Sequence, residues 1–76
     1  MPRYRPISGE RTVKILCKEF GFSVSGQAGS HVRLSKNTPA GKVGTVVPLH
    51  RELKEGTLKG ALRLAKVEYT DFSNHY

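Results

Sequence analysis

Cysteines and long hydrophobic runs are scarce in this chain of 76 residues. A single cysteine, Cys17, excludes an internal disulfide, and no Cys–His pair stands at zinc-ligand spacing. The longest hydrophobic run, around Val46, is far too short to span a bilayer, and no apolar segment follows the arginines near the N-terminus. We therefore expect no metal, no secretion and no membrane insertion, and a reducing cytoplasm fits the cysteine usage best.

The motifs of several common enzyme classes are missing too. The sequence contains no Gly-rich nucleotide loop, no paired carboxylates and no Ser-His-Asp arrangement. Phosphotransfer, glycoside hydrolysis and acyl transfer therefore find no support, and we expect no cofactor.

Acidic residues are few relative to basic ones. Thirteen Lys and Arg against six Asp and Glu give a formal net charge of +7, and the basic residues are spread along the chain. A length of 76 residues allows one compact domain covering residues 1–76, without room for a second core. The charge favours an anionic partner, with nucleic acid as the first candidate because distributed Lys and Arg release counterions from phosphates. A surface that is basic without such a partner stays open as the alternative.

The first half of the chain predicts a helix followed by a hairpin. Ser8 is suited to cap a helix that begins near Gly9, and Gly21 is suited to the left-handed residue after its end. Apolar residues at helical spacing include Cys17, which is therefore expected to pack in the core. Residues 22–25 alternate as a half-buried strand, residues 26–29 supply a turn, and a second strand carries His31.

The second half predicts one more strand and a second helix. Residues 37–41 read as a turn, and the β-branched run 42–47 reads as a strand that Pro48 ends. After a loop at 49–54, a helical stripe begins near Glu55, and the tail adds one short turn that tucks Tyr69 or Phe72 against the core before a frayed end. The apolar stripe of this second helix consists of Leu58, Ala61, Leu62 and Ala65.

This order predicts an α+β fold of the αβββα type, an order also found in double-stranded-RNA-binding domains. A three-stranded antiparallel sheet carries two helices on one face, and its other face is open to solvent.

A histidine on the predicted open face is the strongest candidate for chemistry. Alternation along the strand sends Ser30, Val32 and Leu34 to one face and His31, Arg33 and Ser35 to the other. An imidazole near neutral pH exchanges a proton with a ribose hydroxyl or a leaving oxygen without a metal. Taken from periodicity alone, an ordinary surface histidine explains His31 slightly better than a catalytic one.

Groups around His31 are candidates for binding a phosphate chain. Gly29 allows close backbone approach, Ser30 offers an amide and a hydroxyl, and Arg33 points the same way as His31. His50 lies in a loop that can meet the same substrate, although a solvated loop histidine is equally consistent. His75, near the expected frayed end, is assigned no role. The remaining candidates for phosphate contact, each of which is otherwise a solvated side chain, are Lys36, Lys42, Arg51, Lys54 and Lys59.

Four short motifs, taken in order, resemble the HicA toxin family, also called YcfA-like. They are Gly21-Phe22, Gly29-Ser30-His31 with its apolar-basic strand, the run from Val46 to His50, and the run from Glu52 to Leu58. The likeness covers almost the whole chain. Glu55 stands where a proline is common in the family, and Val32 stands where many members carry a second histidine.

The resemblance implies a double-stranded-RNA-binding-like fold, ribonuclease activity on mRNA, blocked translation and neutralisation by a HicB antitoxin. His31 matches the catalytic histidine of the family's glycine-serine-histidine motif. The leading hypothesis is a metal-independent endoribonuclease, an mRNA interferase, in which a lysine, His50 or water supplies the second proton transfer. The alternatives are a non-catalytic RNA-binding module and a face that chiefly docks another protein.

Overall fold

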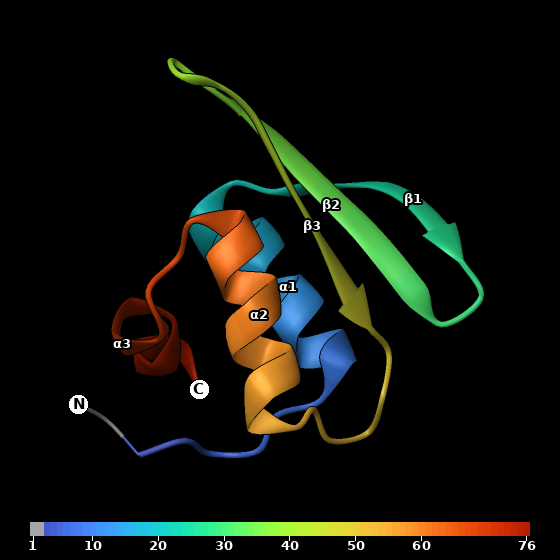
Figure 1. Cartoon of the computed structure of the whole chain (residues 1–76), viewed down its shortest axis with the longest axis vertical. Helices are drawn as coiled ribbons and strands as arrows, with labels where there is room; N and C mark the ends of the chain where they lie inside the picture. Colours follow the sequence, from blue (N-terminus) through green and yellow to red (C-terminus); the bar gives the residue numbers. More distant parts are fainter. Residues whose placement is uncertain (1–2) are drawn as a thin grey trace.

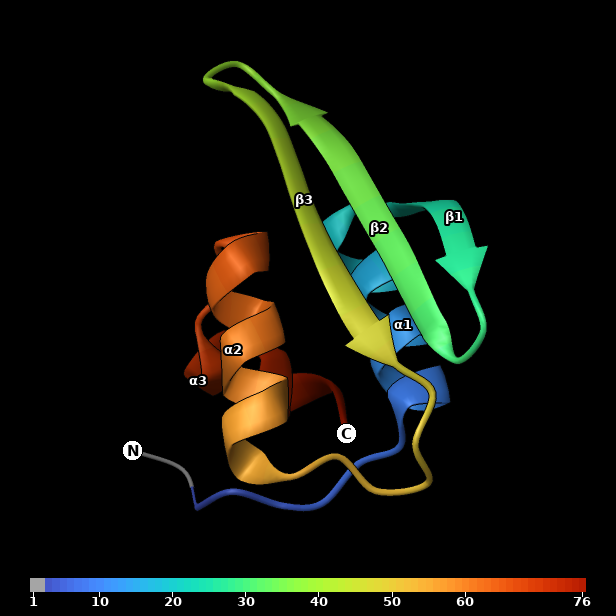
Figure 2. The same cartoon turned by 45° about the vertical axis from the view of Figure 1, so that its right-hand side comes forward.

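The computed structural model describes residues 3–76 and has the element order helix, three strands, then helices (Figure 1). The elements are α1 (Gly9–Phe20), β1 (Ser23–Ala28), β2 (His31–Thr38), β3 (Gly41–Pro48), α2 (Glu55–Ala65), α3 (Tyr69–Phe72) and a final 3₁₀ turn (Ser73–His75). The strands form one antiparallel sheet in the order β1-β2-β3. Both views show α1 and α2 on one side of the sheet, while the β2–β3 hairpin extends beyond them (Figure 2). The predicted α+β class and αβββα order are confirmed, and the arrangement is consistent with a double-stranded-RNA-binding-like fold.

The limits of α1 follow from its capping residues. The Ser8 hydroxyl accepts a hydrogen bond from the Arg11 amide at 3.0 Å, which satisfies one of the free donors of the first turn. At the other end Gly21 adopts φ 77°, a left-handed conformation that favours glycine. The predicted start and end of this helix are confirmed.

Strand β1 is longer than the alternation predicts. The prediction of a turn over residues 26–29 is wrong, because Gly26, Gln27 and Ala28 pair with β2 and the turn comprises Gly29 and Ser30 alone. A β-bulge between Val24 and Gly26 interrupts the alternation of side chains along β1. Because the alternation stops at a glycine, this part of the strand has the sequence pattern of a turn. Val24 on this edge strand is exposed, at 53% of its surface, where the alternation predicts partial burial.

The β2–β3 hairpin is likewise longer than predicted. Its strands pair without interruption from His31 opposite Pro48 to Thr38 opposite Gly41. The turn therefore holds only Pro39 and Ala40, and the predicted turn over residues 37–41 is too long. The Thr38 hydroxyl donates to the Gly41 carbonyl oxygen at 2.6 Å, which helps close the hairpin.

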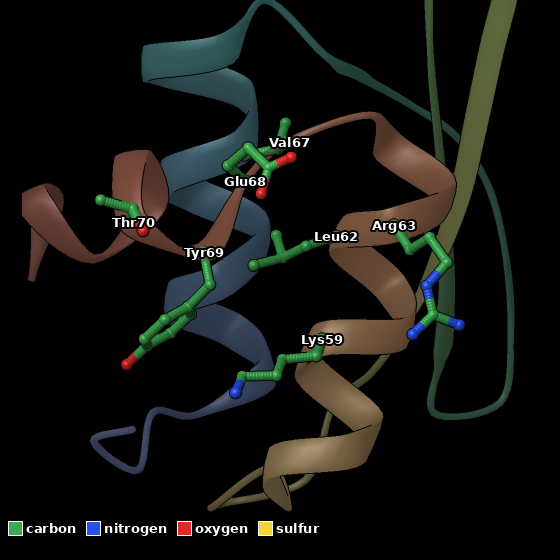
Figure 3. A pocket seen from close by; sticks show the side chains of 7 residues that line it. All are labelled: Lys59, Leu62, Arg63, Val67, Glu68, Tyr69 and Thr70. Carbon is green, nitrogen blue, oxygen red and sulfur yellow. The ribbon is translucent and has the colours of Figure 1, made fainter. Parts of the chain in front are cut away.

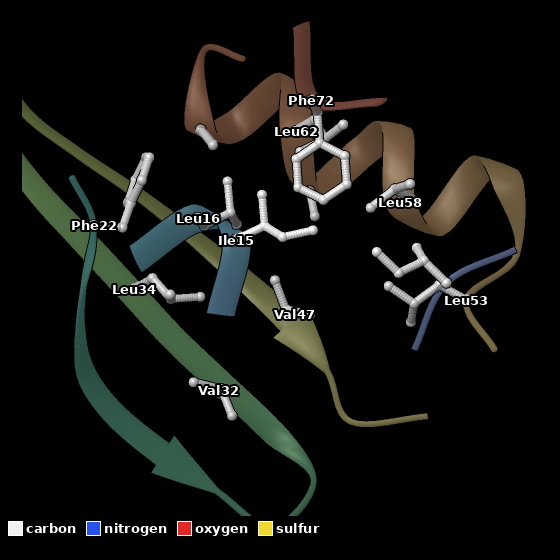
Figure 4. Packing of buried hydrophobic residues seen from close by; sticks show 13 residues of the cluster. Ile15, Leu16, Phe22, Val32, Leu34, Val47, Leu53, Leu58, Leu62 and Phe72 are labelled. Carbon is white, nitrogen blue, oxygen red and sulfur yellow. The ribbon is translucent and has the colours of Figure 1, made fainter. Parts of the chain in front are cut away.

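The core lies between the helices and one face of the sheet (Figure 4). Val32 and Leu34 from β2 and Val47 from β3 face Leu16 of α1. The Thr45 hydroxyl, buried among them, donates to the Ala61 carbonyl oxygen at 2.7 Å and so ties β3 to α2. The predicted stripe of α2 is confirmed, since all four members are buried: Leu58, Ala61, Leu62 and Ala65.

The C-terminal segment packs firmly, so the prediction of a frayed end is wrong. Phe72 is completely buried, as the prediction of a tucked aromatic requires. The Arg5 guanidinium donates to the main-chain oxygens of Ser73 and Tyr76 at 2.8 and 2.7 Å, and the Tyr76 hydroxyl donates to the Arg5 carbonyl oxygen at 2.7 Å. These partners are some 70 residues apart in sequence, which is why local polarity did not indicate the contact.

Helix α1 meets the end of β3 at backbone contact distance. The Gly9 amide donates to the His50 carbonyl oxygen at 2.9 Å. A Cβ atom at Gly9 would lie 1.9 Å from the Pro48 carbonyl oxygen and 2.9 Å from the Leu49 Cα atom. Only glycine therefore allows the helix to approach the sheet this closely.

Gly9→Ala is expected to lower the free energy of unfolding by about 2 kcal/mol, because the new methyl group must push α1 away from β3. The matched control is Gly60→Ala, within α2, where a Cβ atom meets nothing within 4 Å. That change is expected to raise the same free energy by about 0.5–1 kcal/mol through helix propensity. Urea unfolding measures both, and shifts of the same sign would contradict the close contact at Gly9.

Tyr76→Phe is expected to flatten the loss of stability at alkaline pH. Burial, followed by the hydrogen bond with Tyr69, raises the pKa of Tyr76 above its ordinary value near 10. Because the folded-state pKa is the higher one, the hydroxyl's contribution is complete below pH 10 and is lost as the pH rises beyond it. Urea unfolding at pH 8 and pH 11 measures the difference, and an equal decline in both proteins would contradict a raised pKa of the Tyr76 hydroxyl.

Candidate functional site

His31 is the first residue of β2 and follows the turn directly. It is exposed, and its register partners are Ala28 on β1 and Pro48 on β3. Gly29 in the turn has φ 58°, and the Ser30 carbonyl oxygen accepts from the Leu49 amide at 2.6 Å. That hydrogen bond joins the turn before His31 to the chain that leaves β3, so the backbone around His31 is held from both neighbouring strands.

The predicted alternation of β2 is confirmed beyond its first position. Val32 and Leu34 are buried, at 4% and 1% exposure, and His31 and Arg33 are exposed on the other face. Ser30 departs from the prediction that it points inward: it belongs to the turn and is exposed, because the strand begins only at His31. Its hydroxyl is therefore accessible beside the turn glycine.

Arg33 lies on the same face as His31, opposite Gly26 on β1 and Val46 on β3. Its guanidinium rests beside Gly26, where an added Cβ atom would come within 2.6 Å of Nη2. Within residues 3–76, no carboxylate lies within salt-bridge distance of this guanidinium. The arginine therefore presents an uncompensated positive charge to any anion that approaches His31.

Lys36 belongs to the covered face of the sheet. Its ammonium group donates to the Phe20 carbonyl oxygen at 2.9 Å and lies 4.9 Å from the centroid of the Phe22 ring. A cation at the last carbonyls of α1 is favourable for the helix dipole. This lysine is engaged in the fold and does not join His31.

The other basic candidates lie in different places. Lys42 is exposed near the tip of the β2–β3 hairpin, opposite Asn37, and Lys54 is exposed immediately before α2. Lys42 lines a hollow of about 300 Å³ together with Arg33, although it lies several residues along β3 from the partner of His31. Lys54 is not part of that hollow.

His50 lies close to the end of β3 but lines a different hollow from the His31 face. The hollow measures about 260 Å³ and also includes Ser8, Glu10, Leu49 and Arg51. One residue, Leu49, separates His50 from Pro48, the register partner of His31. His50 and Arg51 are therefore neighbours of the His31 region at the α1 end of the sheet, and His31 is not part of their hollow.

A cleft of about 220 Å³ lies between α2 and the α3 segment (Figure 3). Lys59 lines it, but its ammonium group pairs with Glu55 at 2.6 Å and lies 5.6 Å from the centroid of the Tyr69 ring. Figure 3 shows Leu62 between the two segments and the Arg63 head group directed away from Tyr69. The cleft contains none of the residues grouped around His31.

Cys17 lies outside the residues grouped around His31. Cys17 packs against the core, and burial raises the pKa of its thiol, which makes it a poor nucleophile. Over residues 3–76 no three His, Cys, Asp or Glu side chains gather as metal ligands. No helix in that range is both long and apolar enough to cross a membrane.

Gly26 is the site residue that the sequence did not reveal. Its register position opposite Arg33 becomes visible only once β1 continues past the bulge. An isolated glycine between alternating residues was the available signal, since it marks a bulge or a close approach as readily as a turn.

Comparison with known proteins gives the class of the chain. A small, basic αβββα domain with an exposed glycine-serine-histidine turn corresponds to a toxin of bacterial toxin-antitoxin systems: the family model described as HicA toxin of bacterial toxin-antitoxin matches residues 9–67. The chain belongs to the HicA toxin family. Neither the curated proteins nor the solved structures contain a match.

Lys36→Ala is expected to lower the free energy of unfolding by about 1–2 kcal/mol, because it removes a charge-assisted hydrogen bond from the end of α1. Lys42→Ala, at an exposed position of the same hairpin, is expected to change it by less than about 0.5 kcal/mol. Chemical unfolding compares the two. Equal effects would show that the Lys36 contact does not stabilise the fold.

Proposed function

We propose that this HicA-family toxin is an endoribonuclease that cleaves mRNA and thereby inhibits translation, with His31 as its catalytic histidine. The observation that carries the proposal is the exposed imidazole at the start of β2, beside a glycine turn and on the same face as the unpaired Arg33 guanidinium. The net charge of +7 supports a polyanionic substrate. Family membership makes the ribonuclease reading more specific than basicity alone.

The reaction uses a nucleophile that RNA itself supplies. A ribose 2′-hydroxyl attacks the adjacent phosphorus, the bond from phosphorus to the 5′-oxygen breaks, and a 2′,3′-cyclic phosphate forms. One group removes the proton of the 2′-hydroxyl and another gives a proton to the departing 5′-oxygen. His31 takes one of these two roles, and no metal ion is required for either.

The second proton-transfer group is a lysine, His50 or water. Of the two histidines near the end of the sheet, His50 is set in the neighbouring hollow. The pH dependence of cleavage by His50→Ala tests the second histidine: loss of one limb of the profile identifies its imidazole, and an unchanged profile leaves a lysine or water.

The exposed basic groups bind the RNA backbone without reading its sequence. The turn residues Gly29 and Ser30 hold the phosphate at His31, Arg33 binds the RNA chain beside it, and His50 and Arg51 extend the contact toward α1. Lys42 and Lys54 contribute more distant charge, whereas Lys36 contributes less because its ammonium group is already bonded within the fold.

A toxin of this class requires an antitoxin. We propose that the partner is a HicB-like protein that covers the open face around His31 and so blocks access of RNA, and that the toxin acts in the cytoplasm, where mRNA is translated. The open face supports this reading because the helices occupy only the opposite side of the sheet (Figure 1).

His31→Ala is expected to abolish cleavage of purified mRNA while leaving the free energy of unfolding nearly unchanged, because the side chain is exposed. Gel analysis of the RNA and urea unfolding measure the two effects. The matched control is His75→Ala, which removes an exposed histidine that contacts Phe20 edge-on at 5.4 Å, and it is expected to retain cleavage.

Product analysis separates the proposal from its alternative. Cleavage products with 2′,3′-cyclic phosphate ends, formed equally well in the presence of a chelator, support the proposed chemistry. RNA that is retarded in the gel but remains intact with the unaltered protein would instead identify a non-catalytic RNA-binding module.

A further inference from the structure

Gly26 occupies a strand position where the backbone itself does not require glycine. The described glycines with left-handed φ values are Gly21, Gly29 and Gly41, and Gly26 is not among them. Glycine in a strand interior weakens the strand because it lacks a side chain and adds backbone freedom. The space over the Gly26 backbone, and not its conformation, is therefore the property that a side chain at this position would change.

The Arg33 side chain lies there. A Cβ atom built on Gly26 would be 2.6 Å from Nη2, 3.2 Å from Nε and 3.3 Å from Cζ of Arg33. Three atoms of the guanidinium group thus pass over the bare backbone of β1. The two residues are register partners, so their side-chain positions share the open face of the sheet.

The bulge next to Gly26 contributes to this arrangement. It falls between Val24 and Gly26, where the pairing of β1 with β2 shifts by one residue. Bulges increase the local twist and redirect side chains, and they are frequent beside active sites. Here the bulge brings a glycine, instead of a residue with a side chain, opposite Arg33.

We propose that Gly26 is a positioning residue that holds the Arg33 guanidinium against β1, where it binds the RNA phosphate adjacent to the one at His31. The inference rests on the proposed ribonuclease function. His31 and Arg33 are two residues apart on one face of β2, about 7 Å along the strand. A guanidinium already placed at this spacing loses less conformational freedom when it binds a phosphate.

The test is a double-mutant cycle of Gly26→Val and Arg33→Ala, carried out in the His31→Ala protein so that the RNA stays intact. Binding of a short single-stranded RNA is followed by fluorescence anisotropy at several salt concentrations. Arg33→Ala is expected to weaken binding about tenfold, the size of one lost charge-assisted hydrogen bond. It should also reduce the slope of log affinity against log salt by about 0.7, as for one phosphate contact on a single strand.

Gly26→Val is expected to weaken binding at least about threefold when Arg33 is present, since displaced side chains lose part of such a contact. It should have no further effect when Arg33 is already alanine. An equal loss in both backgrounds would overturn the proposal, because the added side chain would then act on RNA or on the fold directly.

A second measurement needs no RNA. Gly26→Val is expected to leave the thermal midpoint of unfolding unchanged or higher, because a β-branched residue favours a strand, and to shift the Arg33 Nε–H resonance in NMR spectra. The control Gly44→Ala adds a methyl group at another glycine of the sheet, where its nearest contact is the Leu34 carbonyl oxygen at 3.6 Å. It is expected to leave that resonance in place, and an unshifted resonance in Gly26→Val would overturn the positioning role.

The two proposals fail in different ways. Cleavage that persists in His31→Ala overturns the catalytic role of His31. The binding cycle is then run with 2′-O-methylated RNA, which has no 2′-hydroxyl nucleophile, and it still tests Gly26 and Arg33. Non-coupled effects of Gly26 and Arg33 overturn the positioning role and leave the ribonuclease mechanism intact.

Discussion

The close approach of α1 to the end of β3 at Gly9 is the contact on which the rest of the structure depends. One amide hydrogen bond to His50 and the absence of a Cβ atom bring the helix against the backbone of Pro48 and Leu49. The same segment holds the turn before His31, because the Leu49 amide donates a hydrogen bond to the Ser30 carbonyl oxygen. The helix start, the strand end and the histidine turn are thus joined through backbone groups, which need hydrogen-bond partners wherever water cannot reach them.

The division of the sheet into two faces decides which residues are available for function. The helices need one apolar face, and β2 supplies Val32 and Leu34 to it, so His31 and Arg33 have to lie on the other. A shift of one residue in the pairing register of β2 would exchange its buried and its exposed side chains completely. Charge alone does not reveal this division. Lys36 carries the same charge as Arg33, yet it lies on the covered face and donates a hydrogen bond to the Phe20 carbonyl oxygen at the end of α1.

The best sequence predictions were those with a local physical cause. The limits of α1 follow from a hydroxyl cap and a left-handed glycine, and the stripe of α2 follows from helical periodicity, so both were correct. The turn at residues 26–29 and the frayed end were wrong because a bulge and an arginine remote in sequence decide those segments. For the site, the pairing of His31 with Arg33 on one face was predictable, whereas the role of Gly26 and the separate hollow of His50 were not.

By itself, the sequence determined the element order, the helix ends, the buried faces and the motif that identifies a HicA-family toxin, because caps, periodicity and short motifs act over a few neighbouring residues. Only the tertiary structure decided which glycine lies under Arg33, which lysine is hydrogen-bonded within the fold, and how the C-terminal segment is held. Those outcomes depend on strand register and on contacts between residues far apart in the chain, and a local sequence pattern determines neither of them.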